Sequence, residues 1–229
     1  MKFIGVVPAR AGSKRLAKKN MRILKNRPLA QWVIEAAKKS RLDYVLVTSD
    51  DEDVLELARQ FGVMTVRRPA HLAQDDSDIV DGVLHAVREL EFPLEETDAV
   101  VLLQPTSPFT RVEDINNACR LLQTSESDSV VSVMEVEHHL HPTKFKTIVD
   151  GRLYPYFVPE QGSSFQQLEK VYVRNGSIYA ARLRLLQSGK FFDDDSVPLV
   201  MPRSVSIDIN DEVDLIVAES LADRTQANS

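Results

Sequence analysis

Apolar runs alternate with amphipathic helical patterns along the first 134 residues, and this alternation constrains the fold more than any other feature of the sequence. The strand-like runs are short and rich in Val. The segments between them carry apolar residues at helical spacing, as Leu29, Trp32 and Val33 do. Short strands that alternate with helices are typical of a parallel sheet covered by helices on both faces. We therefore expect an α/β fold.

The pattern predicts a definite order of elements. Strands are expected at 3–7, 44–48, 63–66, 100–103, 129–134, 172–181 and 205–209. Helices are expected at 28–39, 50–61, 79–90, 112–122, 183–187 and 211–221. Gly62 follows the second helix, where a glycine in the left-handed conformation ends many helices. The length of 229 residues fits one α/β domain with an appendage.

The alternation stops after Val136. Residues 137–170 contain three prolines, two glycines and several aromatic residues, without a helical period. An excursion of this length in a compact domain is usually functional, as a lid, an arm or a partner-binding loop. The predicted organisation is a main domain of residues 1–136 and 171–229, with an arm of residues 137–170 inserted in it.

Composition indicates a soluble globular protein, with 43% hydrophobic and 27% charged residues. The sequence contains no apolar stretch of the roughly 20 residues that a membrane helix needs, so no membrane association is expected. The net charge of −6 argues against nonspecific nucleic-acid binding. The one cysteine, Cys119, excludes an internal disulfide, fits a cytoplasmic location and is expected to be a packed core residue.

Cations gather in the loop after the first predicted strand. Residues 1–34 contain nine Lys or Arg and no Asp or Glu, whereas the other 195 residues contain 19 basic and 34 acidic ones. The loop combines small residues with basic ones: Ala9, Arg10, Ala11, Gly12, Ser13, Lys14, Arg15, Lys18 and Lys19. Cations around a tight turn at the end of a parallel strand indicate an anion site in a ligand crevice.

The phosphate-binding motifs GxxxxGK[ST] and GxGxxG are both absent. In this loop the small residues instead allow backbone N–H groups to approach phosphate oxygens, and the cations neutralise a polyphosphate. For Arg15 and Lys18, a solvated surface run is the alternative interpretation. Further along, the segment 103–108 (LQPTSP) ends an apolar strand. Its prolines stiffen a loop whose Gln104 and hydroxyl groups can read a base edge, although a rigid turn alone would also explain it.

Five segments carry a resemblance to a known family. Residues 8–20 (PARAGSKRLAKKN) resemble the N-terminal signature of the acylneuraminate cytidylyltransferases, also called CMP-sialic acid synthetases. The similarity continues, in the family's order, through residues 68–75, 103–108, 174–179 and 206–209. These segments span nearly the whole chain.

The resemblance implies a Rossmann-like three-layer αβα sandwich of the nucleotide-diphospho-sugar transferase type. The implied reaction joins CMP from CTP to the anomeric hydroxyl of an acylneuraminate-like nine-carbon α-keto acid sugar, with release of pyrophosphate and with Mg²⁺. The resemblance also implies a homodimer, in which residues 137–170 embrace the partner and lend side chains to its sugar pocket. The Tyr and Leu side chains of this segment suit such a contact.

The resemblance also assigns roles to individual residues. The nucleotide-binding set is Ala9, Arg10, Gly12, Ser13, Lys14, Lys19, Asn20, Arg68, Gln104, Thr106 and Ser107. Lys19, Arg10 and Asp208 form the catalytic set, in which Lys19 stabilises charge on the α-phosphate as pyrophosphate leaves. The sugar-binding set is Gln104, Gln166, Arg174 and Asn175. No side chain stands out as a general base, and a metal-bound hydroxide or a carboxylate such as Asp208 remains open for that role.

Asp208, Asn210 and Asp211 are the expected metal ligands. Strand alternation over 205–210 would place Asp208 and Asn210 on one face, and hard oxygen ligands suit Mg²⁺. The chain departs from the family here, because relatives commonly carry a second Asp at the position of Asn210. Asp211 is a substitute ligand or only a helix cap.

A second departure concerns the sugar. Phe165 stands where many relatives carry an Arg thought to meet the sugar carboxylate, and Arg174 or Lys170 would then take over that contact. N-acetylneuraminate, legionaminic acid and pseudaminic acid all remain open. His138, His139 and His141 are expected to pack or hydrogen-bond rather than bind a metal.

Two rival functions remain. A related enzyme activates Kdo with CTP, but its first loop, P-A-R-x-x-S-x-R-L-P-x-K, matches Arg15 and Leu16 better than Lys14 and Asn20. A sugar-nucleotide sensor without catalytic activity is the non-enzyme alternative. The departures at Asn210 and Phe165 favour the sensor, whereas Lys19, Gln104 and Asp208 disfavour it.

Overall fold

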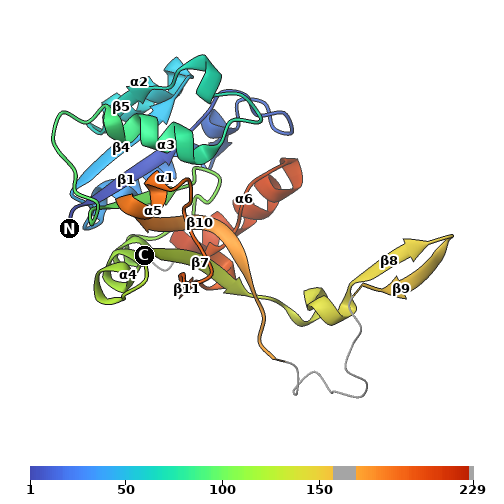
Figure 1. Cartoon of the computed structure of the whole chain (residues 1–229). Coiled ribbons are helices and arrows are strands. Elements are labelled where there is room, and N and C mark those ends of the chain that lie inside the picture. Colours follow the sequence, from blue (N-terminus) through green and yellow to red (C-terminus); the bar gives the residue numbers. More distant parts are fainter. Residues whose placement is uncertain (157–168, 227–229) are drawn as a thin grey trace.

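The computed structural model describes residues 1–156 and 169–226, and it contains a seven-stranded sheet between two layers of helices (Figure 1). The strand order in the sheet is β11-β7-β10-β6-β1-β4-β5. The strands are β1 (Phe3–Pro8), β4 (Tyr44–Ser49), β5 (Met64–Arg67), β6 (Ala99–Leu103), β7 (Ser129–Glu135), β10 (Tyr172–Arg182) and β11 (Val197–Val200). The helices are α1 (Leu29–Lys39), α2 (Glu52–Gln60), α3 (Ile79–Arg88), α4 (Val112–Thr124), α5 (Leu183–Gln187) and α6 (Glu212–Gln226).

Two apolar cores lie on opposite faces of the sheet. Helices α1, α2, α4 and α6 pack on one face, and α3 and α5 pack on the other. The strands alternate between the two cores, so that in β1 Phe3 and Val7 face one and Ile4 and Val6 face the other. All four side chains are at most 2% exposed. The predicted three-layer αβα sandwich is therefore confirmed.

Most predicted elements form within a few residues of their expected bounds. The expected cap after α2 is also present, since Gly62 has a φ of 65°. The sheet is not wholly parallel, however. Strand β10 runs antiparallel to both β6 and β7, while the other pairs in the sheet are parallel. Because β10 follows the long excursion rather than a crossover helix, the helical pattern could not indicate its direction.

The prediction of a strand at 205–209 is wrong. Residues Arg203–Val205 form a short 3₁₀ helix, and the following residues run irregularly to α6. Strand β11, which was not predicted, occupies that edge of the sheet instead and pairs with β7. Its Pro198 is tolerated because an edge strand has a side without ladder hydrogen bonds. The apolar residues Val205 and Ile209 are buried by packing, not by a strand ladder.

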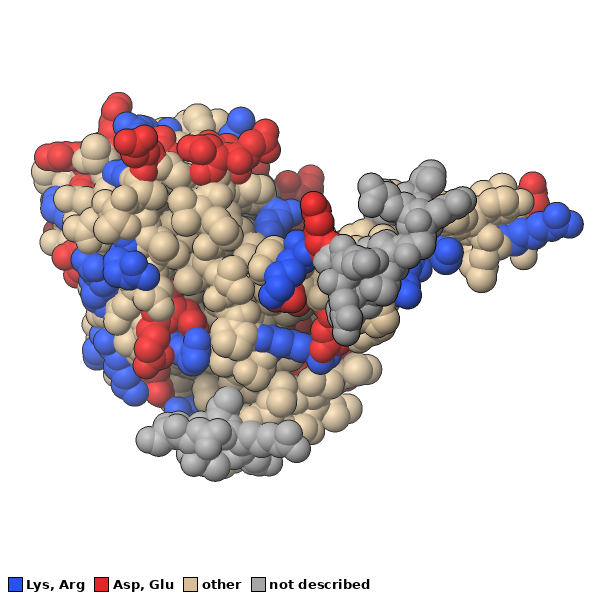
Figure 2. Space-filling model, turned by 90° about the horizontal axis from the view of Figure 1, so that it is seen from below, with Lys and Arg blue, Asp and Glu red and all other residues tan. Residues whose placement is uncertain are grey.

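The segment between β7 and β10 leaves the body of the molecule. It contains two 3₁₀ turns (His138–Leu140 and Pro142–Lys144) and the hairpin of β8 (Lys146–Val149) and β9 (Arg152–Pro155). Figure 1 shows this hairpin projecting away from the sheet, and Figure 2 shows the same arm extending from the body of the molecule. Asp150 and Gly151 both have positive φ, as a two-residue hairpin turn requires. The Asp-Gly pair was the sequence signal for this unpredicted hairpin.

Apolar side chains of the hairpin are open to solvent, with Ile148 72% and Leu153 70% exposed. The predicted residues Phe165 and Gln166 lie outside the described residues. His141 behaves as expected, because its ring nitrogens lie 3.0 Å from Thr143 Oγ1 and 3.3 Å from the Glu169 carbonyl oxygen. Within residues 1–156 and 169–226, no helix has the length and apolar content needed to cross a membrane.

Candidate active site

A cavity of about 500 Å³ opens beyond the ends of β1 and β6. Three loops line it, namely the one after β1, the segment from Arg68 to Ile79 and the one after β6, and Asn210 completes the wall. Five cations line the cavity: Arg10, Lys14, Arg15, Lys19 and Arg68. The cavity therefore lies where parallel strands place a ligand, with a positive lining that suits a polyphosphate.

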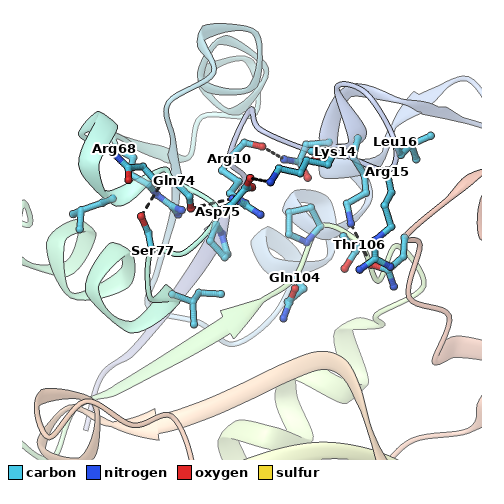
Figure 3. A pocket seen from close by; sticks show the side chains of 18 of the residues that line it. Arg10, Lys14, Arg15, Leu16, Arg68, Gln74, Asp75, Ser77, Gln104 and Thr106 are labelled. Carbon is cyan, nitrogen blue, oxygen red and sulfur yellow. Dashed lines mark hydrogen bonds and ion pairs between the residues drawn. The ribbon is translucent and has the colours of Figure 1, made fainter.

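Arg10 and Lys14 converge on one carboxylate. Arg10 Nη1 donates to Asp75 Oδ1 at 2.7 Å, and the Lys14 ammonium contacts the other oxygen of Asp75 (Figure 3). The hydrogen bond from Lys14, followed by that from Arg10, lowers the pKa of the Asp75 carboxyl. All three side chains are more than a third exposed. The Asp75 carboxylate thus occupies the position that a phosphate would take between Arg10 and Lys14, two of the predicted phosphate-binding residues.

Lys19 lies in a different environment, half-buried and hydrogen-bonded to a distant segment. Its Nζ donates to the Ile209 carbonyl oxygen at 3.1 Å and to Asn210 Oδ1 at 3.4 Å. Burial lowers the pKa of Lys19, while the Asp208 carboxylate partly offsets this effect. Asp208 Oδ2 in turn accepts from Asn210 Nδ2 at 2.8 Å. The predicted catalytic lysine and carboxylate, 189 positions apart in the sequence, therefore both hydrogen-bond to Asn210, although only Lys19 and Asn210 line the cavity.

Arg68 is buried, at 6% exposure, yet its guanidinium reaches the cavity wall. Within the described residues its hydrogen bonds both go to Thr48 and are long, at 3.5 Å and 3.4 Å. Burial lowers the pKa of Arg68. Gly82 of α3 makes room for it, because a Cβ there would lie 3.3 Å from the Arg68 Cζ. The guanidinium keeps donor capacity that a ligand can use.

Asn20 and Thr106 shape the cavity through backbone contacts. Asn20 Nδ2 donates to the Arg10 carbonyl oxygen at 2.9 Å and so holds the basic loop against the body. The Thr106 carbonyl oxygen accepts from the Ile209 N–H at 2.8 Å. Gln104 and Ser13 also line the cavity.

Three other predicted nucleotide-binding residues do not line the cavity. Ala9 and Ser107 are fully buried, and Gly12 is exposed in a neighbouring hollow. The Ser107 hydroxyl has no hydrogen-bond partner within the described part of the chain.

Three of the predicted sugar-binding and metal-binding residues, Arg174, Asn175 and Asp211, do not line the cavity. Arg174 is exposed on β10, with its guanidinium 4.5 Å from the centre of the Phe192 ring. Asn175 is 5% exposed, and its amide is used inside the protein. Asp211 accepts from the N–H groups of Val213 and Asp214 at the start of α6. Asp211 therefore caps the helix, which is one of the two roles that the sequence left open.

The sequence interpretation missed part of the cavity lining. Arg15 lines the cavity, whereas Lys18 points away and pairs with Asp53 at 3.1 Å. The segment Gln74–Ile79 contributes a whole wall. The sequence contained a signal for this wall, because residues 68–75 form one of the five segments that resemble the family. No role had been assigned to the residues after Arg68.

Comparison with known proteins decides the family. A family model described as "Cytidylyltransferase" matches residues 4–196. The chain belongs to this cytidylyltransferase family. Like other members, this cytidylyltransferase is a nucleotidyltransferase, which confirms the class of enzyme expected from the five motif segments.

Its relatives include sugar-activating enzymes. The cytidylyltransferase is 34% identical to CMP-N,N'-diacetyllegionaminic acid synthase of Legionella pneumophila, over 99% of this chain and 98% of that protein. It is 32% identical to the N-acylneuraminate cytidylyltransferase of Escherichia coli, over 95% of this chain and 51% of that protein. A solved structure of CMP:2-keto-3-deoxy-manno-octonic acid synthetase complexed with CTP has the same fold, with a TM-score of 0.73 at 18% identity over 98% of this chain and 100% of that one.

Proposed function

We propose that this cytidylyltransferase transfers CMP from CTP to the anomeric hydroxyl of a nine-carbon α-keto acid sugar and releases pyrophosphate. The observation that carries the proposal is the convergence of five cations on one cavity beside Asp208. Relatives named for legionaminic acid and acylneuraminate support the sugar class.

The chain's own residues act mainly by positioning and by charge. Arg10, Lys14 and Arg15 recruit the triphosphate, and Arg68 with Gln104 orients the nucleoside. The sugar hydroxyl attacks the α-phosphorus and loses its proton to solvent, while the bond to the departing pyrophosphate breaks in line. The Lys19 ammonium balances the charge that develops there. Because Lys19 is half-buried, its charge is less screened by solvent than the charges of the exposed cations.

Magnesium fits the residues at Asp208. Mg²⁺ commonly takes one or two carboxylates and completes its shell with water and substrate phosphates. The described residues contain no cluster of three His, Cys, Asp or Glu side chains that would form an all-protein cage. We propose that Asp208 holds the ion, and that Asn210, whose Nδ2 donates to Asp208 Oδ2 and whose Oδ1 accepts from Lys19, orients this carboxylate rather than binding the ion as predicted. When bound, Mg²⁺ neutralises phosphate charge and orients the triphosphate.

We also propose a cytoplasmic homodimer in which the β8–β9 hairpin contacts the partner. The exposed apolar side chains of the hairpin, including Ile148 and Leu153, support a protein contact. The single buried cysteine is compatible with a reducing compartment. Light scattering tests the dimer, and a monomer at working concentration would contradict it.

The experiment that tests the function is a pyrophosphate-release assay. Each nucleoside triphosphate is combined with a panel of acylneuraminate, legionaminic, pseudaminic and Kdo sugars. We expect release with CTP and with one of the nine-carbon acids. Turnover of Kdo alone would replace the nine-carbon acids by Kdo as the proposed substrate. CTP binding without turnover of any sugar would favour a sensor.

A further inference from the structure

Asn175 lies in a bulge of β10 and has an amide that is fully engaged within the protein. Its Oδ1 accepts from Ser132 Oγ at 2.6 Å and from the Ser177 N–H at 3.2 Å. Its Nδ2 donates to Ser206 Oγ at 2.8 Å. The pairing register between β10 and β7 shifts between Arg174 and Tyr179, which places this amide between the sheet and the segment that follows β11.

These groups form a directional chain of hydrogen bonds. The Ile178 N–H donates to Ser132 Oγ, which donates to Asn175 Oδ1, and Ser206 Oγ donates to the Pro202 carbonyl oxygen. Each serine hydroxyl thus accepts one bond and donates another. Because Asn175, Ser132 and Ser206 are all buried, breaking one link leaves a desolvated polar group without a partner.

The chain of bonds ends at the segment that carries Asp208. This segment was expected to be a strand, but it has no ladder partners and is held by separate contacts. Ser206 is held by Asn175, and Ile209 is held through its N–H by the Thr106 carbonyl oxygen. Asp208 lies between these two tethers, and its carboxylate packs against Gly176, where a Cβ would lie 3.8 Å from Oδ2.

We propose that Asn175 is a positioning residue, which acts through Ser206 to hold Asp208 in place beside Lys19. The inference rests on the proposed function and deepens it. It also replaces the expected direct contact between Asn175 and the sugar, because the amide that would make this contact is buried and used.

A matched pair of serine substitutions tests the proposal. Ser206→Ala removes the link toward Asp208, whereas Ser132→Ala removes the link on the sheet side of the same amide. Loss of a partner that orients a metal ligand typically costs about tenfold or more in activity or metal affinity. We therefore expect Ser206→Ala to lower kcat about tenfold and to leave the KM for CTP within about twofold of the wild type. Ser132→Ala should lose at least as much thermal stability but keep its kcat, because the Ser177 N–H still holds Asn175 Oδ1 and the bond to Ser206 is intact.

A second measurement does not depend on turnover. The affinity of the protein–CTP complex for Mn²⁺, followed by water proton relaxation, should fall in Ser206→Ala and stay unchanged in Ser132→Ala. Ser206→Thr, which keeps the hydroxyl, should restore both kcat and Mn²⁺ affinity.

Three results would overturn the positioning role. They are a Ser206→Ala variant with wild-type kcat and Mn²⁺ affinity, an equal loss of kcat in Ser132→Ala, and a folded Ser206→Thr variant as impaired as the alanine. Failure of the proposed function is distinct from these, since wild-type protein would then release no pyrophosphate with any sugar. The Mn²⁺ comparison still tests the positioning role in that case.

Discussion

Among the cations that line the cavity, a first group of Arg10 and Lys14 is held in a different way from Lys19. Arg10 and Lys14 are exposed and share the Asp75 carboxylate, a side chain that can swing away. Lys19 is half-buried and is held by a backbone carbonyl and by Asn210. Exposed ion pairs contribute little individually, whereas a partly desolvated charge at a fixed place acts strongly on a developing charge. The first group is suited to recruiting an anion, and Lys19 is suited to catalysis.

Replacing Lys19 should have the largest effect. Lys19→Ala removes the fixed charge at the α-phosphate, so we expect kcat to fall roughly 100-fold or more, which corresponds to about 3 kcal/mol of transition-state stabilisation. Steady-state kinetics with CTP measures this loss. Lys18→Ala is the control, because that neighbouring lysine points away from the cavity and pairs with Asp53. Equal losses in the two variants would remove the distinction between the two groups.

Arg68 should rank next, and it should act on binding. Arg68→Ala removes a buried guanidinium with unused donors, so the KM for CTP should rise about tenfold, since a hydrogen bond to a charged group contributes roughly 1.5–3 kcal/mol. Arg67→Ala serves as the matched control, because Arg67 is exposed and pairs with Glu52 at 2.6 Å. An Arg68→Ala variant with an unchanged KM would show that the nucleoside binds elsewhere.

Asp75 should show a smaller change of the opposite sign. The carboxylate competes with an incoming anion for Arg10 and Lys14, so Asp75→Asn should bind inorganic pyrophosphate about twofold to fivefold more tightly, as the modest strength of exposed ion pairs implies. Isothermal titration calorimetry measures the affinity, and the gain should shrink as salt is added. The exposed neighbour gives the control, Asp76→Asn. Weaker pyrophosphate binding in Asp75→Asn would mean that Asp75 serves the ligand directly.

The pH dependence offers the finest test of the comparison. Lys19 binds an anion only when protonated, and burial lowers its pKa from the usual 10.5. CTP affinity should therefore decline as the pH rises, at a lower pH than an exposed lysine would cause. Asp208 raises the pKa of Lys19, so in Asp208→Asn the decline should shift to lower pH. Asp211→Asn, which changes only the cap of α6, should leave its position unchanged. Calorimetry across a pH series measures the decline in CTP affinity. A decline at the same pH in Asp208→Asn as in the wild type would contradict the prediction.

The fold and the site were predictable to different extents. Helices such as α1 and α4 were predicted closely, because their apolar spacing is a property of consecutive residues. The strand at 205–209 failed for a non-local reason. Its alternation was real, but its groups bond to single partners elsewhere, as the Ile209 N–H does to the Thr106 carbonyl oxygen, and β11 forms the sheet edge instead. A local pattern does not show which distant groups will take a segment's hydrogen bonds.

By itself the sequence determined the α/β class, the order of most elements and the five segments that resemble the family, since these depend on spacing along the chain. Only the tertiary structure decided which residues of those segments face the cavity. In that structure Arg15 lines the cavity, whereas Lys18 points away from it and pairs with Asp53. Asp211 caps α6, and the Asn175 amide is buried in a hydrogen-bond network. The physical reason is that burial and hydrogen-bond pairing depend on neighbours distant in the sequence, which the composition of a short segment does not specify.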